Sequence, residues 1–236
     1  MTELDDVLEE LKSMEDPSCV AGMARYGIRS EKCYGISMKK LMAIKHRVGK
    51  NHELAAGLWD SRIHDARLLA CLIDDPKLVT EAQMNRWVKD FDNWAICDGC
   101  CGHLFGKTPF AYRKAREWTM RKEEFVKRAG FVLVATLTVH DKKAEDEAFL
   151  AFLPSILESS TDERQYVMKA VNWALRQIGK RNPRLNREAV RIAERIHKKD
   201  SRSARWIASD ALRELRSDAV QTRMMRLEAK ARRSSP

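Results

Sequence analysis

The sequence has no long apolar run. Nowhere in its 236 residues is there a stretch close to the roughly 18 to 20 apolar residues of a membrane-spanning helix. The start, Thr2-Glu3-Leu4-Asp5-Asp6, is acidic, whereas a signal peptide begins with basic residues and continues with an apolar segment. With 44% hydrophobic and 33% charged residues, the composition is that of a globular protein. The sequence therefore predicts a soluble, cytoplasmic protein without a membrane partner.

Strand and hairpin patterns are also missing. The segment 132–136 is rich in β-branched residues, but no hairpin turn follows it, and Phe131, Val134, Ala135 and Thr138 fit the face of a buried helix. Elsewhere, apolar residues recur every three to four positions. The sequence therefore predicts an all-α protein with a central buried helix over this segment.

The six cysteines show no regular framework, so we expect reduced, buried thiols rather than disulfides. The cluster Cys97-x-x-Cys100-Cys101-x-His103 is the one candidate for zinc. A zinc site needs about four ligands, and the sequence has no second cluster to supply the rest. On a helix the three cysteines share one face, which suits packing equally well. We expect no metal site.

Signatures of common enzyme classes are absent as well. The chain has no HExxH motif and no phosphate-loop pattern, and its scattered histidines form no grouping with Ser and Asp. No cofactor is expected. Four tryptophans lie among apolar residues and are predicted to pack between helices: Trp59, Trp87, Trp118 and Trp206.

The net charge of +10 is unevenly distributed. Residues 161–236 contain 20 Lys and Arg against 9 Asp and Glu, whereas residues 1–160 contain 24 against 25. A basic surplus of this kind favours a polyanionic partner, with nucleic acid first, because each neutralised phosphate releases counterions. The alternative is a basic surface that only keeps the protein soluble.

A loose internal repeat runs through the chain. Five segments align at intervals of 31, 30, 41 and 36 residues, and they begin at Arg67, Asp98, Arg128, Lys169 and Arg205. This period is typical of helix-pair repeats. The sequence predicts a curved solenoid of HEAT-like or armadillo-type antiparallel helix pairs, whose second helices line a concave, basic face. We expect one domain over residues 1–229 and a disordered basic tail over residues 230–236.

Polar and aromatic residues recur on these second helices. Trp94 and Asp98 lie one turn apart on one helix face. On a later helix, an apolar packing stripe stands beside a second stripe of Lys169, Trp173, Arg176 and Lys180. A cationic stripe with a central indole suits a sugar-phosphate backbone. The alternative is a buried tryptophan among solvated cations.

A further row of arginines recurs at spacings of three, four and four residues. These positions either follow a DNA backbone, which we favour, or face water; they are Arg184, Arg187, Arg191 and Arg195.

Three segments together resemble the AlkD-like family of bacterial DNA alkylation repair glycosylases, which are built from HEAT-like repeats. They are Trp94-x-x-x-Asp98, Lys127-Arg128-Ala, and Lys169-Ala-Val-Asn-Trp173-Ala-Leu-Arg-Gln-Ile-Gly-Lys180. The resemblance covers about residues 4 to 218. One departure is Ala95, where AlkD has an acidic residue, and the region around residues 23–27 also differs. Damage recognition is therefore expected to differ in detail.

The resemblance implies a role for each matching residue. Asp98 matches the catalytic carboxylate, Trp94 and Trp173 match the indoles that flank the sugar of the damaged nucleotide, and Arg128 matches the cation that grips the backbone. The cations that we expect to contact DNA are Lys127, Lys169, Arg176, Lys180, Arg181, Arg184, Arg187 and Arg205.

A single carboxylate is sufficient for one kind of glycoside hydrolysis. A purine alkylated at N3 or N7 is cationic and leaves as a neutral base, so the second carboxylate of ordinary glycosidases is not needed. The sequence therefore predicts a monomeric, prokaryotic, nucleoid-associated base excision repair glycosylase. It would act on double-stranded DNA with 3-methyladenine or 7-methylguanine lesions, without cofactor, strand cleavage or obligate protein partner. The alternatives are a non-catalytic binder of damaged or branched DNA and a helical-repeat protein adaptor.

Overall fold

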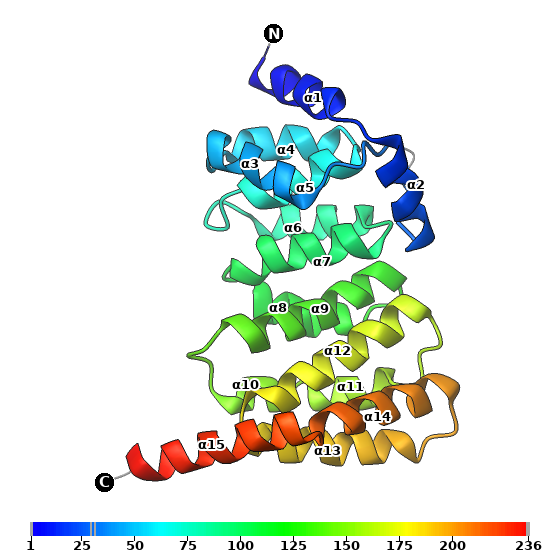
Figure 1. Cartoon of the computed structure of the whole chain (residues 1–236), viewed down its shortest axis with the longest axis vertical. Helices are drawn as coiled ribbons and strands as arrows, with labels where there is room; N and C mark the ends of the chain where they lie inside the picture. The colour runs from blue at the N-terminus through cyan, green and yellow to red at the C-terminus, as the bar shows by residue number, and fades with distance from the viewer. Residues whose placement is uncertain (1, 29, 31, 235–236) are drawn as a thin grey trace. The chain divides into compact units, whose positions relative to one another are not determined.

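The structure is a computed structural model that describes residues 2–28, 30 and 32–234. The chain divides into two compact units, Met1–Ala111 and Tyr112–Pro236. Helices account for the regular structure of the described residues, and no strand occurs among them (Figure 1). The all-α prediction is confirmed, including the helical interpretation of the segment 132–136. Within those residues, no helix is long and apolar enough to span a bilayer.

The first unit contains helices α1 to α7 and two short 3-10 helices. Their bounds are α1 Glu3–Ser13, α2 Pro17–Arg25, α3 Met38–Val48, α4 His52–Asp60, α5 His64–Ile73, α6 Glu81–Trp87, η1 Val88–Asp90, α7 Trp94–His103 and η2 Phe105–Lys107. Its core is aromatic: the rings of Trp59 and Trp87 stack at 4.0 Å, and the guanidinium of Arg67 lies 5.0 Å from the Trp59 ring. α5, which is buried along its whole length, packs against α7.

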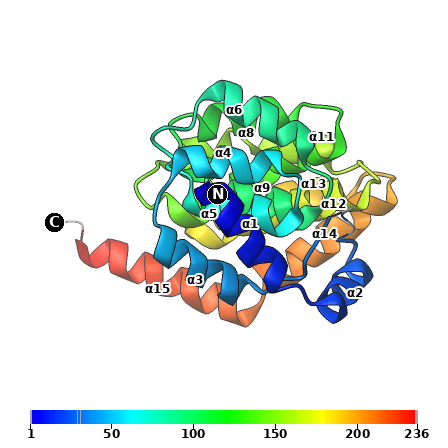
Figure 2. The same cartoon turned by 90° about the horizontal axis from the view of Figure 1, so that it is seen from above.

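The second unit contains the remaining helices. Their bounds are α8 Ala111–Thr119, α9 Glu124–His140, α10 Asp146–Leu150, α11 Leu153–Ser159, α12 Gln165–Arg181, α13 Pro183–His197, α14 Arg202–Leu215 and α15 Asp218–Ser234. α9 packs along α12, which in turn contacts α13 and α14. Both views show α15 continuing past the ends of α13 and α14 (Figure 1, Figure 2).

Two hydrogen bonds, one between α9 and α12 and one between α12 and α14, join residues with the same separation along the chain. Arg128 bonds the residue 38 positions further on, Tyr166, and Asn172 bonds Asp210, also 38 positions away. A second bond in each helix pair joins residues further along both helices, so neighbouring second helices run in the same direction. α9 is nearly all core, and a Cβ added at Gly130 would lie 2.4 Å from the backbone nitrogen of Thr119. This close approach of α8 to α9 requires glycine.

Each aligned repeat position lies on a different helix, as predicted from the repeat. These helices are α5, α7, α9, α12 and α14. The prediction that four tryptophans pack between helices is confirmed for Trp59, Trp87 and Trp118, which are at most 2% exposed, but is wrong for Trp206, which is 41% exposed. The buried stripe of α14 consists of Ser203, alanines, Ile207 and Leu215, and position 206 lies outside this stripe.

The proposed division into one domain over residues 1–229 and a tail stays a prediction. α15 extends through residues 230–234 of the predicted tail, and residues 235–236 lie outside the described part of the chain.

Candidate functional site

α7 carries the first two predicted site residues. The side chain of Asn93 caps the helix by accepting hydrogen bonds from the backbone nitrogens of Ala95 and Ile96, which places Trp94 at the first helical position. The indole Nε1 of Trp94 donates to the carbonyl of Tyr26, at 2.9 Å. Asp98 lies one turn further on, and both Trp94 and Asp98 are half-buried. The structure thus brings this pair together on one helix face, with the indole held in place.

Four thiols lie on the inner side of α7. Cys97, Cys100 and Cys101 are buried in this helix, and Cys71 is buried in α5. Burial, followed by the hydrogen bond between Cys100 and Cys71, raises the pKa of the Cys100 thiol well above its ordinary value, so it is protonated and unreactive at neutral pH. Here the prediction of buried thiols is confirmed. No group of three or more His, Cys, Asp or Glu among the described residues could hold a metal ion.

The remaining cysteines differ from the prediction. Cys19 is exposed at the start of α2, where its thiol bonds the carboxylate of Asp16, and Cys33 is only half-buried. The expectation that all six are buried is therefore wrong for these two. Cys33 lies in the segment between α2 and α3, where helical periodicity cannot indicate burial, and Cys19 lies in α2, none of whose residues is buried.

In the second unit, Arg128 is fixed on α9. Its side chain is 6% exposed and donates through Nη1 to the carbonyl of Tyr166, at 2.7 Å. The neighbouring Lys127 forms an ion pair with Asp162, with Nζ and Oδ2 3.2 Å apart. Burial acts to raise the pKa of Asp162, but hydrogen bonds from Arg164 and Lys127 outweigh it and lower the pKa. Lys127 thus already has an anionic partner in the folded chain.

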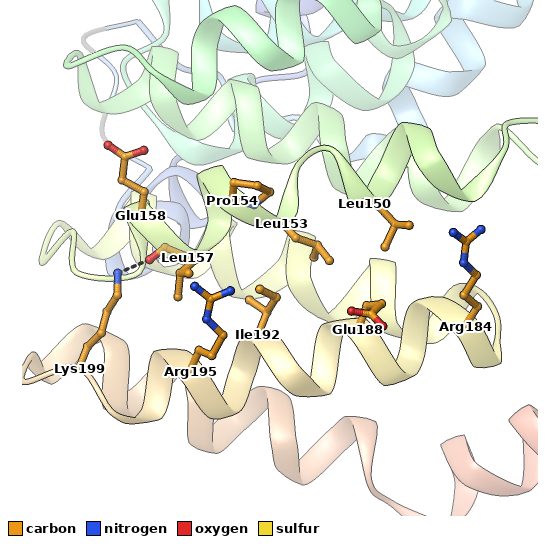
Figure 3. A pocket seen from close by; sticks show the side chains of 10 residues that line it. All are labelled: Leu150, Leu153, Pro154, Leu157, Glu158, Arg184, Glu188, Ile192, Arg195 and Lys199. Atoms are coloured by element: carbon orange, nitrogen blue, oxygen red, sulfur yellow. Dashed lines mark hydrogen bonds between the residues drawn. The ribbon is translucent and has the colours of Figure 1, made fainter.

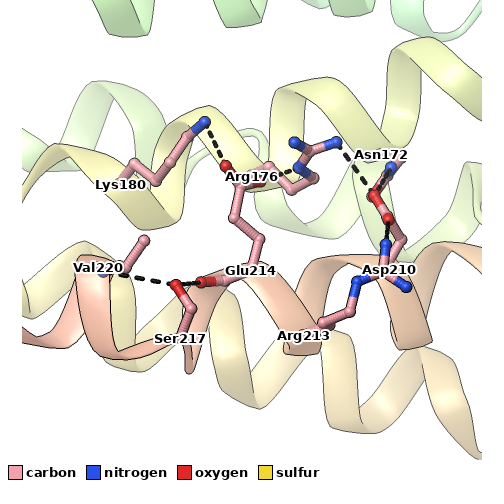
Figure 4. A network of polar contacts seen from close by, with 8 residues as sticks. All are labelled: Asn172, Arg176, Lys180, Asp210, Arg213, Glu214, Ser217 and Val220. Atoms are coloured by element: carbon pink, nitrogen blue, oxygen red, sulfur yellow. Dashed lines mark hydrogen bonds and ion pairs between the residues drawn. The ribbon is translucent and has the colours of Figure 1, made fainter.

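The predicted stripe on α12 contains two different kinds of position. Trp173 is half-buried and Lys169 is exposed. Arg176 and Lys180, in contrast, face α14, where both bind the carboxylate of Glu214; the distance between Lys180 Nζ and Glu214 Oε1 is 2.9 Å (Figure 4). These ion pairs connect α12 to α14. They also neutralise two cations that the sequence predicts to contact DNA.

A second carboxylate completes this network. Asp210 accepts from Asn172 at 2.7 Å and from Arg176 Nη1 at 3.0 Å (Figure 4). Burial acts to raise the pKa of the neighbouring Glu214, but the hydrogen bonds from Arg176 and Lys180 outweigh it, and the pKa is lowered. The sequence pattern could not show these pairs, since the partners are 34 to 38 residues apart.

The other predicted DNA contacts also have partners within the chain. Arg181 donates to the carbonyls of Thr138 and Ala144, both at 2.8 Å, and its guanidinium lies over the Phe149 ring. These contacts hold the side chain of Arg181 within the fold. The remaining three arginines form exposed ion pairs. Such a pair contributes only about 0–1 kcal/mol to stability, so a phosphate can replace its carboxylate. These pairs join Arg184 to Glu147, Arg187 to Glu228 and Arg205 to Asp200.

A cavity of about 690 Å³ lies in the second unit between α13 and the α10–α11 segment (Figure 3). Its floor is apolar and its rim is charged. It shares Arg184 and Arg195 with the arginines predicted to follow DNA but includes none of the predicted catalytic residues. Its lining consists of Leu150, Leu153, Pro154, Leu157, Glu158, Arg184, Glu188, Ile192, Arg195 and Lys199.

Two contacts at the site carry no signature in the sequence. The acceptors of Trp94 and Arg128 are the main-chain carbonyls of Tyr26 and Tyr166. Every residue has a carbonyl, so residue type could not identify either partner.

Comparison with known proteins relates this arrangement to a family. A family model described as DNA alkylation repair enzyme matches residues 7–215. The Listeria innocua protein Lin0241 is 25% identical over 202 residues, covering 84% of this chain and 88% of its own length. The Listeria monocytogenes protein Lmo0209 is 24% identical over 172 residues, covering 71% of this chain and 76% of its own.

A solved structure shares the fold. It comes from a family described as related to the HEAT-like repeat DNA glycosylases with affinity for branched DNA structures, and it matches with a TM-score of 0.76 at 19% identity, covering 90% of this chain and 95% of its own. The likeness shows a HEAT-like repeat fold. Because the family match extends over most of the sequence, the chain belongs to the DNA alkylation repair enzyme family.

Proposed function

We propose that this protein is a monofunctional DNA glycosylase that hydrolyses the N-glycosidic bond of cationic alkylated purines. The observation that carries the proposal is the pair on α7: a half-buried carboxylate, Asp98, lies one turn from Trp94, whose indole is held by the Tyr26 carbonyl. The family match and the HEAT-like fold support the same reading.

In the proposed reaction, the main requirement is to stabilise the positive charge that develops on the sugar. A purine alkylated at N3 or N7 already carries positive charge, and it leaves as a neutral base without a general acid. The deoxyribose then becomes an oxocarbenium ion, and the carboxylate of Asp98 stabilises this cation and orients the attacking water. At about 4 Å and an effective dielectric constant of about 20, the attraction is about 4 kcal/mol, close to a thousandfold in rate.

The aromatic and basic residues have supporting roles in this proposal. The faces of Trp94 and Trp173 stabilise the partial positive charge of the sugar, each by about 0.5–2 kcal/mol. Arg128 holds the phosphate backbone beside the damaged nucleotide. Arg128 is 6% exposed and bonds the Tyr166 carbonyl, so in this role it meets phosphate only through the small part of its side chain that remains exposed.

The test is release of 7-methylguanine and 3-methyladenine from methylated duplex DNA by the unmodified protein and by Asp98→Asn, with DNA affinity measured in parallel. We expect Asp98→Asn to lower the single-turnover rate about a thousandfold while affinity changes little. A matched control is Asp60→Asn, which makes the same chemical change at an exposed position of α4 in the same unit. This control should keep the full rate.

Branched-DNA binding without catalysis is the second candidate, favoured by the solved relative with affinity for branched DNA structures. It predicts that the unmodified protein binds DNA but releases no base. Absence of both binding and release would favour the protein adaptor.

A further inference from the structure

The exposed face of α14 carries a tryptophan among arginines. The buried side chains of this helix pack inward, and Asp210 and Glu214 bind residues of α12. Five residues of the helix remain exposed and, together with Arg216 directly after it, form what we term the α14 outer stripe: Arg202, Arg205, Trp206, Ser209, Arg213 and Arg216. α14 therefore presents to solvent the combination that the sequence had suggested for α12.

Cations of the α14 outer stripe are available to phosphate in a way that Arg176 is not. Arg213 and Arg216 have acidic neighbours, but their own side chains are 77% and 53% exposed. Exposed pairs of this kind are weak and screened by salt, so phosphate can replace the carboxylate at little cost. Arg176 is held by two carboxylates and is 32% exposed.

The register of the second helices relates Trp206 to α12. With the 38-residue offset of the Asn172–Asp210 bond, position 206 lies across from position 168, next to the exposed Lys169. A helix rises about 1.5 Å per residue, so the stripe from Arg202 to Arg216 is about 21 Å long, sufficient for several phosphates of one strand. The exposed Lys169 is therefore expected near the Trp206 level of the α14 outer stripe, where it adds a further positive charge.

We propose that the α14 outer stripe binds a DNA strand that contains an unpaired base, with that base stacked on Trp206 and its flanking phosphates on the stripe's arginines. An indole stacks on any base, but the base must first offer a free face. In a fully paired duplex the bases stack on one another. The surface should therefore favour DNA with a single-stranded segment. The inference rests on the proposed function in one respect, that DNA is the ligand.

The experiment compares two probes: a duplex with a 3′ overhang of about ten thymidines, and the same duplex fully paired. Trp206→Ala should weaken binding of the overhang probe about tenfold and leave binding of the paired probe nearly unchanged. Trp206→Phe keeps an aromatic face and should retain most of the affinity. Arg213→Ala should weaken both probes and reduce the salt dependence of binding, because it removes a phosphate contact.

A matched control is Met225→Ala on α15, which truncates another exposed apolar side chain, 61% exposed, and should affect neither probe. The base-release assay on methylated duplex separates the two proposals. If the unmodified protein releases no base and Trp206→Ala still loses overhang binding selectively, the glycosylase proposal fails and this inference stands. If Trp206→Ala binds the overhang probe as the unmodified protein does, or if polyglutamate displaces the protein from DNA while oligothymidine does not, this inference is overturned.

Discussion

α7 and α12 each carry one of the half-buried tryptophans assigned to the proposed reaction, but the two helices differ in what surrounds it. α7 has small residues, with buried thiols behind it, and a Cβ added at Gly102 would meet nothing within 4 Å. α12 is packed against α9, and its Arg176 and Lys180 bind carboxylates of α14. A basic stripe in a repeat protein can therefore stabilise the stack of helices through ion pairs instead of binding a ligand.

The largest effect on stability should come from adding a side chain at Gly130, where α9 approaches the backbone of α8. A Cβ at Gly130 would lie 2.4 Å from Thr119 N and 2.7 Å from the carbonyl carbon of Trp118, both backbone atoms. Gly130→Ala should therefore lower the free energy of unfolding by about 3 kcal/mol. Gly102→Ala, in the open environment of α7, should raise it by about 0.5–1 kcal/mol. Urea denaturation of both variants measures the difference, and equal effects would contradict the contrast between the helices.

A smaller effect is expected from the ion pairs of α12. Glu214→Gln removes the charge that binds Arg176 and Lys180, so it should lower the free energy of unfolding by about 1–2 kcal/mol. The single-turnover rate of base release at saturating protein should stay the same, because the network has no part in the proposed chemistry. A loss of rate comparable to that of Asp98→Asn would mean that the α12 network does take part in catalysis.

The smallest effect is the pH dependence of the difference in free energy of unfolding between the unmodified protein and Glu214→Gln. The pKa of Glu214 is lowered from its ordinary value of 4.5, so the folded state binds its proton less readily than the unfolded chain. Its stabilisation is fully present above about pH 4.5 and is lost as the pH falls through the lowered pKa. The stability difference between the unmodified protein and Glu214→Gln should therefore shrink in acid. Denaturation series between pH 7 and pH 3 test this. A stability difference that grows in acid would contradict a lowered pKa of Glu214.

The sequence was informative where a residue's type determines its environment. Apolar periodicity was enough to predict α9 as a helix through the β-branched segment 132–136. Asn93 and Asn182 cap the helices that carry or follow predicted site residues, as their residue type favours. The aromatic core of Trp59 and Trp87 likewise followed from their apolar neighbours.

The sequence was uninformative about partners in other repeats. Arg176 and Glu214 are 38 residues apart, and nothing local distinguishes a cation that will meet a carboxylate from one that faces solvent. Trp206 shows the converse: its apolar neighbours suggested burial, but they pack on a face that excludes it. The helix that carries the α12 stripe was therefore predicted correctly, the partners of its charges were missed, and its role in DNA binding stays a prediction.

The hydrogen bond from Trp94 to Tyr26 has a consequence for how sequences of this kind diverge. The acceptor is a main-chain oxygen, and the Tyr26 side chain itself is 76% exposed. Substitutions at position 26 can therefore accumulate without disturbing the indole, and related chains need not agree there. A change in the length of α2 is different, because Tyr26 directly follows this helix and its carbonyl would be displaced. In this region, the length of the chain is therefore more constrained than the identity of its residues.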